Sequence, residues 1–546
     1  MNTPRAVKPN SAMKVLVIDD QQQVRHIIRE SLYRLGFKHV LMAGDAAEAL
    51  RHLRSEPMDL VLSDYNLGDG PDGQQLLEAA RGGRLLSPVA PWIFISANAL
   101  RGDVLAAGDF LPDGYIIKPF TDQLLARYIE GLTARKQALA PLLLAADAQK
   151  WDEVLKEAEA FIKRGDALSS EGLKHKAQAL MRLARFEEAL ACYGSALDLN
   201  SELAWARLGH AQAQRALGRP EAARAELERL TRAQPSFASA YDILLEITEE
   251  QGDAEAALNT ARAVADLVPN AKRKTRLGGL ALAAGETELA VKVLEQAVAK
   301  NRHAVNPGPQ DSVLLAQALL DNGEPARAAT LAAELGKRFA EQGPARLLAK
   351  ALGAQAQQQL GNETAAAALM DEVAAALETE GTALDGPSKL LLARSALSTG
   401  HPDLGQQLIG EVARNHGDKP LLMASALRAA AGTPAEAECR KLIERASEEV
   451  AQAMTDLQRA KRSGELGQAL EVGERILARS PQNFNVLIEL CTLHLIVMGR
   501  QTDEAVRQTH RDRARELLER LELHHPMHDR VAAARKFFRE RVGGKA

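Results

Sequence analysis

The sequence predicts a doubly wound, five-stranded parallel α/β domain followed by a long all-helical repeat array. From Lys14 to about residue 130, short apolar runs alternate with amphipathic segments, which is typical of βαβ units. Beyond that point a small residue, usually glycine, recurs at nearly constant spacing between helical segments. The chain has 546 residues, too many for one compact core, so a module joined to an array fits its length.

The expected strands are short and almost continuously apolar. KVLVID at 14–19, LVLSD at 60–64, WIFIS at 92–96 and GYIIKP at 114–119 would be the first, third, fourth and fifth strands of the sheet. Runs of this kind suit parallel strands covered by helices on both faces. We expect a flexible tail at 1–12, because it holds two prolines and no periodicity, and the α/β domain at 13–132.

Composition excludes several function classes. The formal net charge of −4 gives no positive field for nucleic-acid or membrane binding. The cysteines Cys192, Cys439 and Cys491 are scattered, which argues against a disulfide framework or a zinc site and suits a reducing cytoplasm. The longest apolar stretch, 88–100, is interrupted by Pro, Ser and Asn and is too short to span a membrane. With no signal-peptide pattern at the N-terminus, we expect a cytoplasmic protein.

The helical section carries a repeat, marked by the small residue that opens each second helix. These markers stand at 184, 218, 252, 285, 323, 361, 400, 432 and 464, with spacings of 34, 34 and 33, then 38, 38 and 39, then 32 twice. A period near 34 residues is the tetratricopeptide signature. The second helix of this repeat needs an aromatic, a small, an aromatic and a small residue in turn. Segment 184–200 has these as Phe186, Ala189, Tyr193 and Ala196. The array at 133–546 thus resembles tetratricopeptide repeats, strongly over 150–300 and loosely over 301–540.

Polar residues follow the predicted strands where parallel strands end at one edge of the sheet, the usual place for ligands. They are Asp19, Asp20, Asp64, Ser96 and Lys118. Clustered carboxylates repel one another unless a cation joins them, and hard oxygen ligands favour Mg²⁺. A lysine and a hydroxyl beside such a metal complete a site for phosphoryl oxygens. The residues therefore indicate phosphoryl transfer onto a carboxylate, giving an acyl phosphate.

The segments VLVIDD, VLSDYNL, IFISANA and GYIIKPF together resemble the receiver domain of two-component response regulators over about residues 13–130. The resemblance implies that Asp64 is the phosphoacceptor and that Ser96 and Lys118 bind the phosphoryl group. It also implies Mg²⁺ ligation by Asp19, Asp20, Asp64 and the backbone carbonyl of Asn66. Tyr115 would be the aromatic switch whose rotamer follows Ser96, and Pro119 would follow a cis peptide bond.

One departure concerns the loop after the third strand. Receivers usually have Pro four residues after the acceptor and Asp-Gly at seven and eight. Here these places are taken by Gly68, Pro71 and Asp72, and Asp72-Gly73 comes one residue late. We therefore expect a longer and looser loop, although no proposed ligand is affected.

These features predict a response regulator whose output is protein binding by the array, with no enzymatic output domain. A sensor histidine kinase or a histidine phosphotransfer protein would supply the phosphoryl group, and an unidentified protein would bind the repeats. A homodimer is possible. The alternative is a constitutive assembly or scaffold factor whose receiver serves as a phosphate sink or an oligomerisation module.

Two further expectations concern the junction and the C-terminal region. Between Thr121 and Trp151 only Gly131 and Pro141 interrupt the helical pattern, so we hypothesise that the receiver's last helix packs directly onto the array. His524, His525 and His528 are expected in a solvated turn rather than a metal site. The arginines at 511, 513, 515 and 520 alternate with acids and indicate a charged helix face with local ion pairs.

Overall fold

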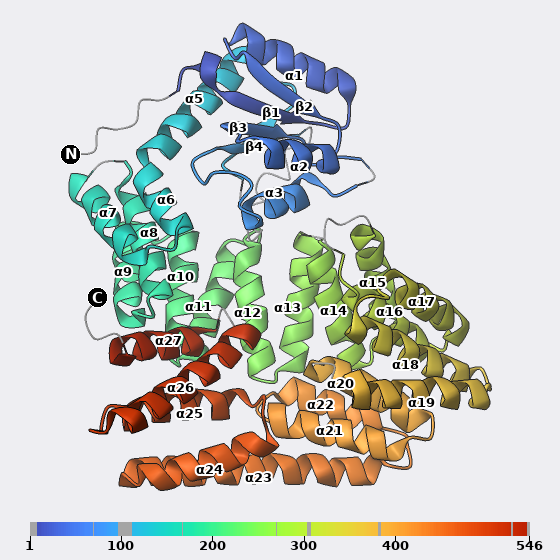
Figure 1. Cartoon of the computed structure of the whole chain (residues 1–546). Coiled ribbons are helices and arrows are strands. Elements are labelled where there is room, and N and C mark those ends of the chain that lie inside the picture. The colour runs from blue at the N-terminus through green and yellow to red at the C-terminus, as the bar shows by residue number, and fades with distance from the viewer. Residues whose placement is uncertain are drawn as a thin grey trace. The chain divides into compact units, whose positions relative to one another are not determined.

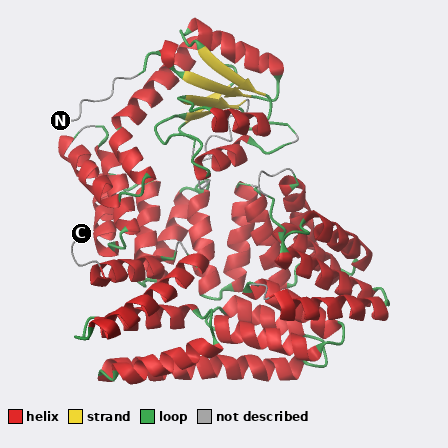
Figure 2. Cartoon of the chain, viewed as in Figure 1, coloured by secondary structure: helices red, strands yellow, loops and turns green. Residues whose placement is uncertain are grey.

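The computed structural model describes residues 8–68, 70–96, 112–165, 167–268, 270–302, 307–380, 384–525 and 528–542. Its strands all lie in the N-terminal part of the chain, and the remaining described elements are helices (Figure 2). The strands are β1 Lys14–Ile18, β2 His39–Ala43, β3 Leu60–Ser63, β4 Trp92–Ser96 and β5 Gly114–Ile117. Between them lie α1 Gln22–Arg34, α2 Ala46–Ser55 and α3 Gly73–Gly82, after the short 3-10 helix Asn10–Ala12.

The five strands form one parallel sheet in the order β2-β1-β3-β4-β5. In register, Ile18 at the end of β1 lies opposite Ala43 of β2 and Ser63 of β3. This confirms the predicted doubly wound parallel fold. The carboxyl ends of β1 and β3, which precede the predicted acidic residues, lie side by side in its centre.

Both faces of the sheet are buried, as the unbroken apolar strands require. On one face, Val15 and Val17 pack with Ile28 and Leu32 of α1 and with residues of the last receiver helix. On the other face, Leu16 and Ile18 pack with residues of α2 and α3. Alternate residues of one strand therefore supply two separate cores.

The helices that follow the sheet are arranged largely as successive pairs (Figure 1). Their bounds are α5 Asp122–Ala138, α6 Ala140–Asp147, α7 Trp151–Arg164, α8 Ser169–Arg182, α9 Phe186–Leu199, α10 Ala204–Ala216, α11 Pro220–Ala233, α12 Ala238–Glu250, α13 Ala254–Leu267, α14 Ala271–Ala284, α15 Thr287–Asn301, α16 Gln310–Asp321, α17 Pro325–Arg338, α18 Gly343–Gln359, α19 Glu363–Glu380, α20 Gly386–Ser398, α21 Pro402–His416, α22 Pro420–Ala430, α23 Glu436–Ser463, α24 Leu466–Arg479, α25 Phe484–Met498, α26 Glu504–His524 and α27 Asp529–Val542.

The described residues form two compact units. The first contains the residues up to Leu244, with the later stretches Ala263–Arg273 and 299–308, and the second contains the rest. None of the helices in the described ranges is long and apolar enough to cross a membrane.

The repeat markers coincide with the tight turns inside the helix pairs. Each marker glycine, from Gly218 to Gly464, has a positive φ between 72° and 83°. This left-handed conformation reverses the chain in few residues and favours glycine, which has no Cβ to clash. The first marker is Ala184, which has a φ of 53° although its Cβ disfavours this conformation. The spacing found in the sequence is therefore the spacing of these turns.

The spacings of 38 from Gly323 and 39 from Gly361 are wide mainly because each contains a longer helix. Helices α18 and α19 have 17 and 18 residues, whereas α8 and α9 have 14 each. Between the markers Gly432 and Gly464, the marker pattern implies two helices, but the structure has only α23, with 28 residues. Residues 436–463 contain no Gly or Pro, so nothing in the backbone interrupts this helix.

The receiver's last helix continues almost directly into the array. Gly131 lies inside α5, and Pro141 lies in the first turn of α6, where proline costs no hydrogen bond. Leu139 is at once the C-cap of α5 and the N-cap of α6. The side chain of Leu139 packs in one apolar cluster with residues of α6, α7 and α8. The predicted direct packing of the junction is present within the first unit.

The histidines near the C-terminus correct one expectation. His525 and His528 lie against the ring of Phe484, with centroid distances of 4.9 and 4.4 Å, so they are packing groups rather than parts of a solvated turn. The arginines of α26 form the expected ion pairs: Arg515 with Asp512, and Arg513 with Glu516 and with Glu474 of α24.

Candidate functional site

The backbone places the predicted site residues at the carboxyl edge of the sheet. The amide of Asp64 donates to the carbonyl of Ile18 at 2.7 Å, and the amide of Asp19 donates to that of Ala43 at 3.2 Å. On the other side of the sheet, the amide of Lys118 donates to the carbonyl of Ser96 at 2.8 Å. These hydrogen bonds extend the ladders by one residue and fix where each side chain begins.

The side chains of Asp19, Asp64 and Lys118 meet at this edge. Lys118 Nζ lies 2.8 Å from Asp19 Oδ2 and 2.7 Å from Asp64 Oδ2. One ammonium therefore bridges two carboxylates that come from different strand ends, separated by 99 and 54 residues in sequence from the lysine. Such charge-assisted bonds fix the lysine beside both acids.

Burial makes this arrangement electrostatically demanding. Asp19 is only 1% exposed, and burial raises its pKa above the ordinary value even though Lys118 and the amide of Gln21 favour its charged form. Burial lowers the pKa of Lys118, but hydrogen bonds to Asp19 and Asp64 outweigh that effect and leave it raised. The lysine therefore stays cationic and offsets part of the charge of the two acids.

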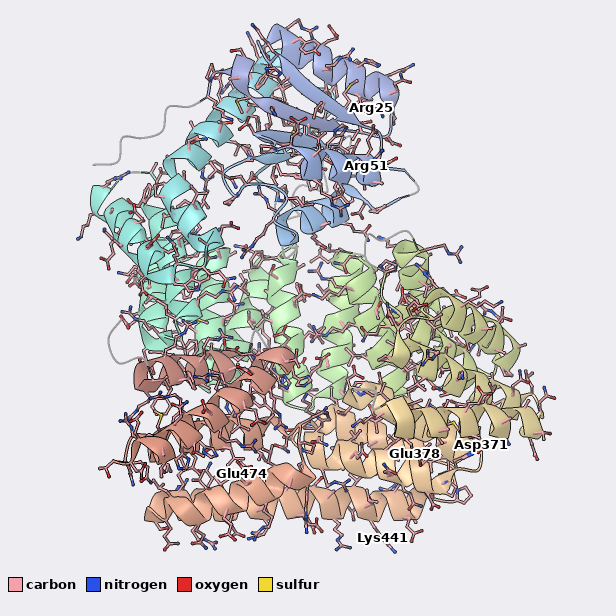
Figure 3. The ribbon with its side chains drawn as sticks, in the orientation of Figure 1. Arg25, Arg51, Asp371, Glu378, Lys441 and Glu474 are labelled. Carbon is pink, nitrogen blue, oxygen red and sulfur yellow. The ribbon has the colours of Figure 1, made fainter. Side chains whose placement is uncertain are left out.

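Arg25 of α1, labelled in Figure 3, holds the turn that carries the two acidic residues. Its Nη1 donates to the carbonyls of Asp19 at 2.5 Å and Asp20 at 3.2 Å. Gly44 allows this position, because a Cβ there would lie 3.3 Å from the same nitrogen. Sequence reasoning missed Arg25, since an arginine near the start of an amphipathic helix carries no distinctive signal.

Asp20 and Asn66 lie at the open side of the site. Asp20 is exposed, and a Cβ on Gly68 would lie 3.9 Å from its Oδ2. The amide of Asn66 donates to Asp64 Oδ1 at 3.3 Å. Within the described residues no three acidic, histidine or cysteine side chains already form a metal-ligating group. The donors nevertheless suit a hard cation, because they are carboxylate and backbone oxygens at a solvent-facing edge.

Ser96 and Tyr115 lie on the neighbouring strands β4 and β5. Ser96 is buried at the end of β4, opposite Ile117 of β5. Tyr115 is partly buried, and its ring meets that of Phe94 edge-on at 6.5 Å between centroids. The peptide bond between Lys118 and Pro119 is cis, as the sequence predicted. The switching role of Tyr115 and the phosphoryl contact of Ser96 stay predictions.

The loop after β3 is fixed at its far end, contrary to the expected looseness. Asp72 caps α3 and forms a reciprocal capping box with Gln75. The amide of Gly73 donates to the carbonyl of Tyr65 at 2.7 Å. A Cβ on Gly73 would lie 2.3 Å from the carbonyl oxygen of Asp64, so this close approach requires glycine. Asp72-Gly73, one residue late in sequence, therefore still anchors the loop beside Asp64.

Comparison with known proteins agrees with this geometry. A family model described as response regulator receiver domain matches residues 15–130, and one described as tetratricopeptide repeat matches 177–246. Chemotaxis protein CheY of Pseudomonas aeruginosa is 36% identical over 123 residues, which cover 22% of this chain and 98% of that protein. Chemotaxis protein CheY-3 of Vibrio cholerae is 33% identical, over 23% of this chain and 95% of that protein.

Two solved structures are similar to parts of the chain. Chemotaxis response regulator CheY4 of Vibrio cholerae has 22% identity and a TM-score of 0.21, covering 22% of this chain and 98% of its own. A tetratricopeptide repeat protein from Parabacteroides merdae has 13% identity and a TM-score of 0.30, covering 46% of this chain and 95% of its own.

The fold and the edge-of-sheet acids define a receiver domain followed by a helical repeat array. Through that domain the chain belongs to the response regulator receiver family, and tetratricopeptide repeats follow the domain in sequence. It is therefore a signalling regulator with a protein-binding type of array.

Proposed function

We propose that this protein accepts a phosphoryl group on Asp64 and that the phosphoryl group controls protein binding by the array. The observation that carries the proposal is the bridge from Lys118 Nζ to Asp64 at 2.7 Å and to Asp19 at 2.8 Å. It brings an acceptor carboxylate, a second acid and a fixed cation together at one solvent-facing edge. The same set was expected from the resemblance to receivers.

In the proposed transfer, a carboxylate oxygen of Asp64 attacks the phosphorus of a phosphohistidine on a sensor kinase or phosphotransfer protein. The P–N bond breaks, the imidazole leaves with the bonding pair, and an aspartyl phosphate forms. Lys118 stays beside the new phosphoryl oxygens, and Ser96 supplies a hydroxyl. Asp19, Asp20, Asp64 and the carbonyl of Asn66 would hold Mg²⁺. When bound, the ion neutralises charge on the transferring group.

The array would act as the output through protein binding rather than catalysis. Stacked helix pairs offer long surfaces for peptides or partner helices. In the regular repeats the first helix α8 keeps accessible polar residues, among them Lys174, Gln178 and Arg182. The cysteines Cys192, Cys439 and Cys491 are free and buried, which suits a cytoplasmic setting.

The first test is labelling with a small acyl phosphate donor and Mg²⁺, read on a phosphate-affinity gel. Wild-type protein should shift, and Asp64→Asn should show no shift because the acceptor is gone. Asp122→Asn is the matched control, since Asp122 is a receiver aspartate that pairs with Arg34 at the surface, away from the proposed site. Labelling of Asp64→Asn equal to wild type would contradict the assignment.

The second test separates controlled from constitutive binding. Proteins captured from a lysate of the source cells by wild type are compared with and without the donor, and with Asp64→Asn. A partner whose recovery changes only with labelled wild type supports control by phosphorylation. Equal recovery in all samples would instead indicate a constitutive scaffold.

A further inference from the structure

Two adjacent residues of α5 bind different parts of the chain, one the receiver and the other the first repeats. Lys136 Nζ lies 2.6 Å from Asp113 Oδ1 and donates to the carbonyl of Pro88 at 2.9 Å, both within the receiver. Its neighbour Arg135 pairs with Glu171 in the first turn of α8. Helix α5 is thus tied to the receiver by one residue and to the first repeats by the next, at the end where it runs into α6 (Figure 1).

Asp113 is the centre of the receiver side of this link. Its Oδ2 accepts from Arg81 of α3 at 3.1 Å and from the amide of Trp92 in β4 at 2.8 Å. Arg81 also donates to the carbonyls of Ser87 and Ala90, at 2.7 and 2.8 Å. The carboxylate therefore joins α3, the start of β4 and α5. We call Arg81, Asp113 and Lys136 the Asp113 cluster.

The Asp113 cluster is partly buried and carries more positive than negative charge. The side chains of its three members are 12 to 16% exposed. Burial lowers the pKa of both Arg81 and Lys136, and Asp113 only partly offsets this. Two cations share one carboxylate. If Lys136 moves away, the Asp113 carboxylate therefore remains paired with Arg81. Such a contact is suited to having a made state and a released state.

The position of the cluster connects it with the phosphoacceptor site. Asp113 immediately precedes β5, the strand that carries Tyr115 and ends one residue before Lys118. A Cβ on Gly114 would lie 2.7 Å from Leu132 of α5, so β5 and α5 are in close contact there. A shift of β5 caused by a change at Lys118 or Tyr115 would move Asp113 and strain its bond to Lys136.

A cavity beside the link leaves room for α5 to move. Its volume is about 240 Å³, and it lies between the amino-terminal edge of the sheet, α5 and α6. Met58 and Pro91 line it from the receiver, and Gln137 and Leu144 from the two helices. Thr133 of α5 also lines it, and its buried hydroxyl has no hydrogen-bond partner. The junction is therefore not fully packed in this conformation.

We propose that the bond between Asp113 and Lys136 is the positioning contact through which the state of Asp64 reaches the repeat array. Phosphorylation shifts β5, the bond is released, and α5 with α6 repacks toward the cavity while Arg135 carries the movement to α8. This proposal rests on the proposed function, and it names the contact that couples the two parts. Coupling of this kind requires two discrete packings of one element, here α5.

The bond between Asp113 and Lys136 is tested on the unphosphorylated full-length chain by amide hydrogen exchange. Lys136→Met should speed exchange of peptides covering 130–147 by at least about tenfold, because a partly buried charge-assisted bond is lost. Arg34→Gln is the matched control. It breaks another ion pair of α5, the exposed bond to Asp122, and should leave those peptides unchanged. Unchanged exchange in Lys136→Met would overturn the proposal whether or not Asp64 is ever phosphorylated.

Transmission is tested by adding beryllofluoride, a phosphoryl mimic, with Mg²⁺. Binding is followed by fluorine NMR, and exchange is followed in α5, α6 and α8. Wild type should bind the mimic and change exchange in all three helices. Lys136→Met and Arg135→Gln should bind it equally but lose the change in α8. A full response of α8 in both variants would refute the link. If wild type fails to bind the mimic, the proposed function is wrong, while the exchange test of the bond between Asp113 and Lys136 remains valid.

Discussion

The first helices of the helix pairs are buried differently in the regular and the divergent parts of the array. In α8 the buried residues are Gly172, Ala177, Ala179 and Leu180, which leaves the rest of its surface at least partly accessible. In α16, Leu315 to Leu320 are all buried, and consecutive residues over that length face every direction around a helix. Helix α8 thus keeps an accessible surface, whereas helix α16 is part of the core of the divergent part.

Buried polar contacts support this difference. In the divergent part, Gln355 of α18 accepts from Ser395 of α20 at 3.3 Å, and both side chains are buried. Asp321 at the end of α16 pairs with Arg394 of α20 at 2.6 Å. These bonds join first helices of different pairs directly. In the divergent part, the first helices α16, α18 and α20 are therefore packed against one another through polar bonds.

The largest expected effect comes from placing a charge on each kind of first helix. Ala351→Glu in α18, where Ala351 is fully buried, should cost about 4 kcal/mol or more of local stability because the new carboxylate has no partner. Gln178→Glu on the exposed side of α8 should change the local stability by less than about 0.5 kcal/mol. Amide hydrogen exchange of the surrounding helices measures both. Equal effects would show that the two parts are not packed differently.

A smaller effect should come from glycines of the regular part. A Cβ on Gly209 of α10 would lie 2.2 Å from the ring of Tyr193 in α9, so Gly209→Ala should destabilise by about 1 to 3 kcal/mol. Gly194 on α9 has nothing within 4 Å of such a Cβ, so Gly194→Ala should stabilise by up to about 1 kcal/mol. Thermal unfolding followed by circular dichroism compares the two. A loss of stability from Gly194→Ala would contradict the open position assigned to it.

The smallest expected effect is a pH dependence in the divergent part. Burial, with Lys419, Lys389 and His525 nearby, lowers the pKa of His416 to about 4, and Asp385 opposes this only weakly. The folded state then binds fewer protons than the unfolded state between pH 6.5 and 4, so stability falls as pH falls through that window.

The expected loss is about 1 to 2 kcal/mol after allowance for partial solvent exposure. Urea unfolding at pH 7 and pH 4.5 should show a smaller difference for His416→Gln than for wild type. The exposed His524→Gln is the control and should behave as wild type. The same pH dependence in all three proteins would assign it to other groups.

Much of the receiver could be predicted from sequence because its signals are local and ordered. Apolar runs fix the strands, and Asp19, Asp64 and Lys118 each follow one of them directly. Parallel strands bring such residues to one edge whatever the loops do. The repeat turns were visible for a similar reason, because a left-handed turn such as that at Gly218 restricts the residue type at one position.

Other features depended on contacts between distant segments, and these only the tertiary structure decided. The sequence does not indicate that Arg81, Asp113 and Lys136 share one partly buried cluster, since each is an ordinary charged residue far from the others in sequence. The packing of His525 and His528 against Phe484 and the burial of α16 on every side likewise depend on distant segments. Periodicity predicts where the chain turns between two helices, because a tight turn depends on a few neighbouring residues. Which helix faces water depends on the helices packed around it.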